Sequence, residues 1–316
     1  MVAPTLVQLE PRLFDKMGVV IKIETTEGED ALPTAADAMI FSNVTFRPMV
    51  ATRVQRNLVM PQQGNQGVIL TGYNAQIEFD VELAGSGVAG TPPKWGTLMR
   101  IGSFSEIITP TTSVEYRRID ANREHATVYV VLDGVRHVLL GASAALKATI
   151  NSLGIPHLHG TITGLLGTIT DQPNLAFSKA GWLTPEPISP EITQLKLHGW
   201  QAIAESLEID FGTKVVTRFL IGSQGVPITG YSATGTAVVQ ATKLAIVDWF
   251  QKAKSRERGI LDFTHGVNAG NIINIKSQFV ETGEPSIGQT DNILNYSLGL
   301  DICSDGSPED IVLTLT

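Results

Sequence analysis

Residues 85–90, GSGVAG, are the part of the chain whose types and spacing most resemble a chemical motif. They fit the G-x-G-x-x-G turn that holds the pyrophosphate of a dinucleotide between a strand and a helix. The preceding strand, however, carries acidic residues on one face, whereas the strand before such a turn is buried on both faces in a parallel sheet. Pro92 and Pro93 also fall where the cofactor-binding helix should already have begun. A glycine-rich turn that binds no nucleotide is therefore the better prediction.

The titratable residues do not form a catalytic or metal-binding set. Glu78, Asp80 and Glu82 could act as acid and base, but a row of carboxylates along one strand is typical of a solvated surface, because catalysis needs convergent partners and a pocket. His157 and His159 have the spacing of two metal ligands, yet no nearby Cys or third His completes the set. We therefore expect no enzyme activity, no cofactor and no metal.

The carboxylates belong to the clearest strand pattern in the sequence. From residue 75 to residue 83, apolar residues occupy the odd positions and polar residues the even ones. A period of two places the two sets on opposite faces of one strand. The segment 233–242 keeps the same phase, but its polar face is neutral. The polar face of the first segment consists of Gln76, Glu78, Asp80 and Glu82.

These alternating segments are parts of an internal repeat. The tripeptide TGY at 71–73 returns at 229–231, directly before each alternating segment. A short helical pattern with a tryptophan follows in both copies. In the first copy Thr91 can cap the helix, Pro92 suits its first position and Gly102 can end it.

The repeat and the many short alternating runs favour a mainly β protein with two tandem domains. Residues 172–190 hold four prolines, which is typical of a connection. We predict a first domain at 1–180 and a second at 181–316, each a β-sandwich or barrel with a short flanking α-helix.

The first copy is longer than the second before the TGY tripeptide. About seven extra residues centre on a polar, glycine-containing segment, which we interpret as the tip of a long hairpin. The segment consists of Pro61, Gln62, Gln63, Gly64, Asn65, Gln66 and Gly67.

Composition excludes several classes of protein. No apolar run approaches the roughly 18 residues of a membrane span, and the single cysteine, Cys303, rules out an intrachain disulfide. The net charge is −8, divided into −2 for residues 1–180 and −6 for residues 181–316. Neither half has the excess of positive charge that a nucleic-acid-binding surface needs to neutralise phosphates.

Four stretches of the first half resemble the tail tube proteins of long-tailed bacteriophages, in the longer form with two tube domains. The segment from 79 to 100 is the most specific, and the second half is assigned through the repeat. The stretches are 31–38 (ALPTAADA), 42–45 (SNVT), 79–87 (FDVELAGSG) and 89–100 (AGTPPKWGTLMR).

The resemblance implies a structural virion protein, assembled in the cytoplasm of a host bacterium. In this family, rings of such domains enclose a lumen, and the rings stack into the tube that conducts DNA during ejection. Most single-domain relatives form six-membered rings, so three two-domain chains would fill one ring. The implied partners are other copies of the chain, a tape measure protein in the lumen, and tail terminator and distal tail proteins at the tube ends. DNA would pass without specific binding.

We expect the polar face of residues 76–82 to line the lumen, because an acidic or neutral wall repels DNA within a Debye length of about 8 Å. A solvated outer face is the alternative, since periodicity does not fix direction. We expect the hairpin tip at 61–67 to reach the next ring, with an N-terminal arm at 1–17 as a second stacking element. Two other functions remain open: an inner tube of a contractile tail or secretion-like system, and a soluble ligand-binding β protein.

Overall fold

The computed structural model describes residues 11–62, 64–175 and 178–316. Strands account for 53% of the protein and helices for 5%. The predicted class, mainly β, is therefore confirmed.

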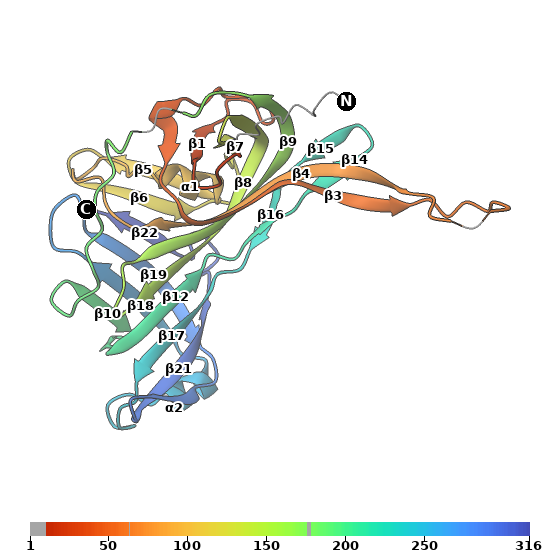
Figure 1. The fold of residues 1–316 in the computed structure, drawn as a ribbon. Helices are drawn as coiled ribbons and strands as arrows, with labels where there is room; N and C mark the ends of the chain where they lie inside the picture. Colours follow the sequence, from red (N-terminus) through yellow and green to blue (C-terminus); the bar gives the residue numbers. More distant parts are fainter. Residues whose placement is uncertain (1–10, 63, 176–177) are drawn as a thin grey trace, which may run out of the picture.

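In the first half of the chain, antiparallel strands pair in the order β1–β7–β8–β9–β4–β3. Helix α1 follows β4, and the hairpin β5–β6 comes between α1 and β7 (Figure 1). The elements are β1 (Met17–Ile23), a 3-10 turn (Ala35–Asp37), β2 (Ala38–Met39), β3 (Ser42–Gln55), β4 (Val68–Glu82), α1 (Gly96–Ile101), β5 (Phe104–Thr109), β6 (Ser113–Arg118), β7 (Ala126–Leu132), β8 (Val135–Asn151) and β9 (His157–Asp171).

In the second half, the strands pair in the corresponding order β10–β18–β19–β21–β17–β12, and α2 follows β17 as α1 follows β4. The elements are β10 (Thr193–Leu197), β11 (Trp200–Gln201), β12 (Ala204–Asp210), β13 (Thr213–Val215), β14 (Arg218–Leu220), β15 (Ser223–Gly225), β16 (Ile228–Tyr231), β17 (Thr234–Gln240), α2 (Trp249–Ser255), β18 (Arg258–His265), β19 (Ile273–Thr282), β20 (Ser286–Thr290), β21 (Ile293–Ile302) and β22 (Val312–Leu315).

The two halves are joined by strand pairing as well as by the connection between β9 and β10. The end of β8 pairs with β12, and β6 pairs with β22. One hydrophobic cluster contains buried residues of both halves. The division into domains at 1–180 and 181–316 stays a prediction, because the sheet and the core continue across it.

The alternation in β4 is confirmed. The apolar side chains of Ala75, Ile77, Phe79, Val81 and Leu83 are at most 1% exposed, so this face covers the core. The intervening polar side chains lie on the opposite face of the sheet, because successive residues of a strand point to opposite sides.

The predicted start of the first helix is wrong, whereas its predicted end is confirmed. Helix α1 begins at Gly96 and ends before Gly102, so Thr91 and Pro92 lie outside it. Pro92 is itself followed by a proline, which disfavours the helical conformation at the preceding residue. The segment therefore forms turns, and the indole of Trp95 is fixed by donating to the Ala84 carbonyl oxygen at 2.8 Å.

The predicted long hairpin is confirmed. Strands β3 and β4 pair as far as Gln55 and Val68 and form an arm that projects from the rest of the molecule (Figure 1). The shorter hairpin β14–β15 reaches out on the same side. The chain thus has one end with two hairpin tips.

Candidate functional site

The polar face of β4 continues across the sheet into the second half of the chain. Asp80 lies opposite His159 of β9, which lies opposite Lys147 of β8, which in turn lies opposite Asp210 of β12. Because these positions share one face, the predicted residues belong to a surface that spans both halves. We call this surface the polar sheet face; it includes Gln76, Glu78, Asp80, Glu82, His157, His159, Lys147, Thr149, Glu208, Asp210, Thr234 and Thr236.

The carboxylates of the polar sheet face contact polar side chains on neighbouring strands. Asp80 Oδ1 is 2.7 Å from His159 Nδ1, and the amide of Asn43 donates to Asp80 Oδ2 at 2.7 Å. His159 Nε2 is also 3.5 Å from Glu78. Burial alone would raise the pKa of Asp80, but the hydrogen bonds from Asn43 and His159 outweigh burial and lower this pKa.

An ion pair on this face crosses from one half to the other. Lys147 Nζ of β8 is 2.8 Å from Glu208 Oε1 of β12. These partners of Glu78, Asp80 and Glu208 were not predicted from the sequence. His157 and His159 are separated by two positions, as are the carboxylates at 78, 80 and 82, and this spacing indicates that each set lies on one face of a strand. The sequence does not show which strands pair with each other.

Within the described parts of the chain, no group of three or more His, Cys, Asp or Glu residues is arranged to hold a metal ion. None of the helices that the structure describes is long and apolar enough to cross a membrane.

The glycine-rich turn at 85–90 is a contact between the halves. Gly85 N donates to Asn271 Oδ1 at 2.7 Å, and Gly87 N donates to the Gly270 carbonyl oxygen at 3.0 Å. A Cβ on Gly85 would lie 2.0 Å from that same carbonyl oxygen. The glycines therefore permit two backbones to touch, and these amide groups are already occupied by protein acceptors.

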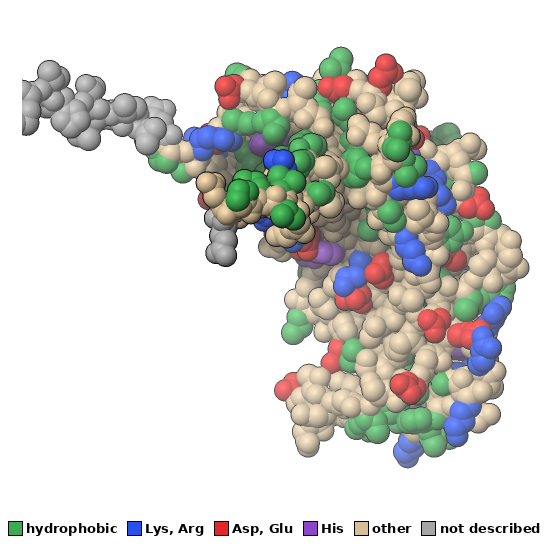
Figure 2. All heavy atoms as spheres, turned by 90° about the vertical axis from the view of Figure 1, so that its right-hand side faces the viewer, with side chains coloured by type: hydrophobic (Ala, Val, Ile, Leu, Met, Phe, Trp, Pro, Cys, Tyr) green, Lys and Arg blue, Asp and Glu red, His purple; other side chains and the backbone are tan. Residues whose placement is uncertain are grey.

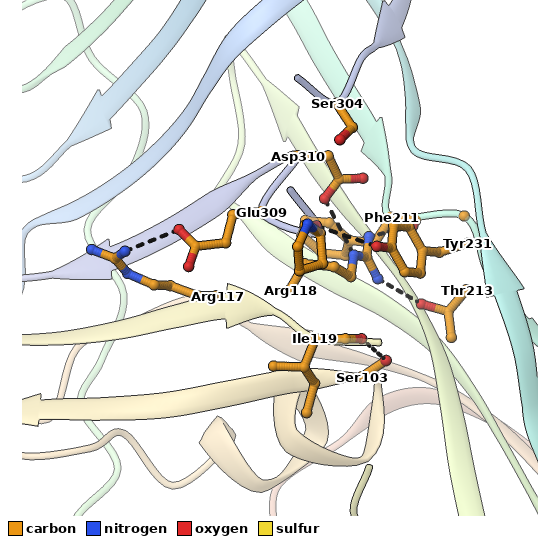
Figure 3. Close-up of polar contacts among 12 residues, drawn as sticks. Ser103, Arg117, Arg118, Ile119, Phe211, Thr213, Tyr231, Ser304, Glu309 and Asp310 are labelled. Atoms are coloured by element: carbon orange, nitrogen blue, oxygen red, sulfur yellow. Dashed lines mark hydrogen bonds and ion pairs between the residues drawn. The ribbon is translucent and has the colours of Figure 1, made fainter. Parts of the chain in front are cut away.

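Arg118 forms a second contact between the halves (Figure 3). Its guanidinium donates to Asp310 at 3.3 Å, to Thr213 at 3.1 Å and to the Phe211 carbonyl oxygen. It also lies 4.6 Å from the ring centre of Tyr231. The Arg118 side chain is fully buried, and burial lowers its pKa and raises that of Asp310. This cluster gave no signal in the sequence.

Strands β3 and β20 are among the strands that have an edge without a partner in the described structure. Strand β3 pairs only with β4, and β20 pairs only with β21, whereas their counterparts β12 and the end of β8 are paired on both sides. Every residue of β20 is exposed. Open edges present unpaired backbone groups to other chains.

The predicted stacking loop lies at the end of the arm, where its described residues are mostly exposed. The Gln66 amide both donates to and accepts from the backbone of Leu58, so the tip is closed by a side chain. Hydrophobic side chains gather on the arm (Figure 2). They include the consecutive residues Leu58, Val59 and Met60, which are 46%, 104% and 51% exposed.

Two of the stacking predictions fall partly on residues that the structure does not describe. Gln63 of the stacking loop and residues 1–10 of the predicted N-terminal arm lie outside the described residues. From Arg12 onward, the segment is attached to the turn between β7 and β8, where Leu13 N donates to Asp133 at 2.7 Å.

Comparison with models of known protein families gives no match, and comparison with curated protein sequences gives no match either.

Proposed function

We propose that the protein is a ring-forming subunit of a phage tail tube, with three chains in each ring. The observation that carries the proposal is the pairing of β12 with β8 inside one chain, beside open edges on β3 and β20. If β3 of one chain pairs with β20 of the next chain as β12 pairs with β8, the junction between chains has the same form as the junction between the two halves of one chain. A closed ring then leaves neither of these two edges open.

The internal repeat predicts which residues of β3 and β20 would lie opposite each other. Inside the chain, Ile209 of β12 lies opposite Ala148 of β8. Phe46 of β3 corresponds to Ile209, because Phe46 pairs with Ile77 of β4 as Ile209 pairs with Gly235 of β17.

The other side of the junction follows from the same comparison. Ile287 of β20 pairs with Tyr296 of β21 as Ala148 pairs with Leu158 of β9. Phe46 of one chain is therefore expected opposite Ile287 of the next. Ile287 is 68% exposed in the single chain, although the corresponding Ala148 is fully buried. A neighbouring chain would cover this apolar side chain.

The chemistry of the polar sheet face supports passage of DNA. Its cations are few, and Lys147 is already paired with Glu208. Threonines and carboxylates make up much of the rest. Such a wall has little to neutralise phosphates, so DNA would not adhere to it.

Electron microscopy of the purified protein in negative stain tests the proposal. We expect rings with the mass of three chains and, at high protein concentration, long hollow tubes. Dispersed monomers at every concentration would contradict the proposal. Cross-linking through cysteines at Phe46 and Ile287 tests the junction separately and should give covalent dimers and trimers in a Cys303→Ser background.

A further inference from the structure

We propose that the tip of the arm docks into an apolar pocket between the two halves of a second copy of this chain. The inference rests on the proposed function, because the second copy belongs to the neighbouring ring. It goes further by assigning the surface that receives the arm.

The pocket lies where β8 and β12 meet, under the connection that leads into β10. Its volume is about 340 Å³, which is within the range of ligand-binding clefts. Most of the area that lines it is apolar. The apolar residues come from both halves and include Ile150, Ile188, Leu195, Ile203, Leu207 and Phe263.

The arm and the pocket lie at opposite ends of the sheet. Strand β4 begins at the arm and runs away from it, and β8 runs in the same direction, because both are antiparallel to β9. The pocket is lined by residues at the far end of β8 and by the beginning of β12. A contact between opposite ends of identical chains is heterologous, so it can be repeated without limit along an axis.

The apolar tip matches the apolar pocket. Leu58, Val59 and Met60 are three consecutive exposed hydrophobic residues, and Pro61 follows them. The Gln66 side chain holds both backbone groups of Leu58 before the arm binds, which reduces the entropy lost on docking.

The charges of the two surfaces are complementary. Residues 42–77 contain Arg47, Arg53 and Arg56 and no acidic residue. Glu205 lines the pocket, and Glu191 follows directly after the lining residue Pro190. Among the residues that the structure describes, none of these five charged groups forms an ion pair. Docking would bring the cations of one chain to the carboxylates of another.

Single cysteines test the contact directly. In a Cys303→Ser background, one chain carries Val59→Cys and an affinity tag, and a second carries Ser152→Cys at the pocket. After mixing and removal of reductant, we expect a disulfide-linked heterodimer. The matched control is Ser223→Cys, an exposed serine beside β14 at the arm end, which should give at least ten-fold less heterodimer. Equal yields from the two acceptors, with tubes present, would overturn the inference and leave the tube proposal standing.

A substitution in the pocket gives a second test. Ile203 lines the pocket and is 61% exposed, so Ile203→Arg should fold normally. We expect rings of unchanged mass and a loss of tubes. Ile260→Arg, at an exposed position on β18 outside this pocket, should form both. Tubes of normal length from Ile203→Arg would contradict the docking site, whereas absence of rings from the unmodified protein would contradict the proposed function itself.

Discussion

Arg118 joins the two halves of the chain through a buried ion pair with Asp310. Its charge is fully buried and its partner Asp310 is 4% exposed. Removing one member of a buried ion pair leaves the other charge unpaired. We expect Arg118→Met to lower the free energy of unfolding by about 3–5 kcal/mol, measured by urea denaturation.

Arg117 provides the matched control for this prediction. It is the neighbouring residue and pairs with Glu115 and Glu309 at the surface. Exposed pairs contribute little, so Arg117→Met should cost no more than about 1 kcal/mol. Equal stabilities of the two variants would show that the buried cluster does not hold the halves together.

His265 makes the stability depend on pH. Its Nδ1 is 2.8 Å from Thr193 Oγ1, and its Nε2 donates to the Glu186 carbonyl oxygen at 3.2 Å. Burial lowers the pKa of His265 below the value of about 6.5 that is usual for histidine. The unfolded chain therefore binds the proton more readily, so this stabilisation is complete above pH 6.5 and falls as the pH falls through the folded pKa. His265→Asn should lose less stability than the unmodified protein between pH 7.5 and 5.5, as measured by urea denaturation at each pH. The same decrease in both proteins would argue against this role.

At the scale of elements, the sequence predicted those features that depend on residues close together in the chain. The alternation at 75–83 gave both faces of β4, because a strand half buried in a sheet must alternate. The extra residues before TGY predicted the long hairpin, because a polar segment with glycines between two strands is typical of a hairpin tip. The start of α1 was predicted wrongly at Thr91, because the capping pattern took no account of two adjacent prolines.

Contacts between distant segments could not be predicted in this way. Asn43 reaches Asp80 because β3 and β4 are neighbours with a register shift near residue 43. Arg118 reaches Asp310 across 192 positions because β6 pairs with β22. Neither pairing has a periodic signal, since the order of strands in a sheet depends on the whole fold. The polar sheet face was therefore predicted for one strand only.

The open edge of β20 allows a prediction for this element. In a single chain, Ile287→Lys should change stability by less than about 0.5 kcal/mol, because the side chain is exposed. In the proposed junction the lysine would be buried against Phe46 without a partner, at a substantial cost. We expect the concentration needed for ring formation to rise at least ten-fold, measured by light scattering after size-exclusion chromatography. Ile260→Lys, on a strand paired at both edges, should leave ring formation unchanged.

At the scale of the whole molecule, the two ends have different roles in the proposed assembly. The β3–β4 arm carries the hairpin tip that we predict to reach the next ring. Deleting Gln62 to Gln66 removes five of the seven residues of the stacking loop, including the Gln66 clamp that holds Leu58, but it leaves both edge strands in place. We expect soluble rings and no tubes in electron micrographs. Normal tubes from the deletion would mean that stacking does not use the arm.

The unequal halves also predict a charge pattern for the proposed lumen. Glu78, Asp80 and Glu82 of β4 correspond to neutral residues in the second half, at 236, 238 and 240. In a ring of three chains this row of carboxylates would then occur three times and not six, because the corresponding strand β17 is neutral. Replacing Glu78 and Glu82 by lysine keeps the Asp80–His159 contact and changes each chain by four charges.

We expect tubes of the Glu78→Lys/Glu82→Lys variant to retain DNA in a co-sedimentation assay, whereas tubes of the unmodified protein do not. Retention should fall steeply with salt, because binding that neutralises phosphates releases condensed counterions. Glu78→Gln/Glu82→Gln removes the acids without adding cations and controls for damage to the sheet. If the lysine tubes bind DNA only on their outer surface, as gold-labelled DNA would reveal in micrographs, the polar sheet face does not line the lumen.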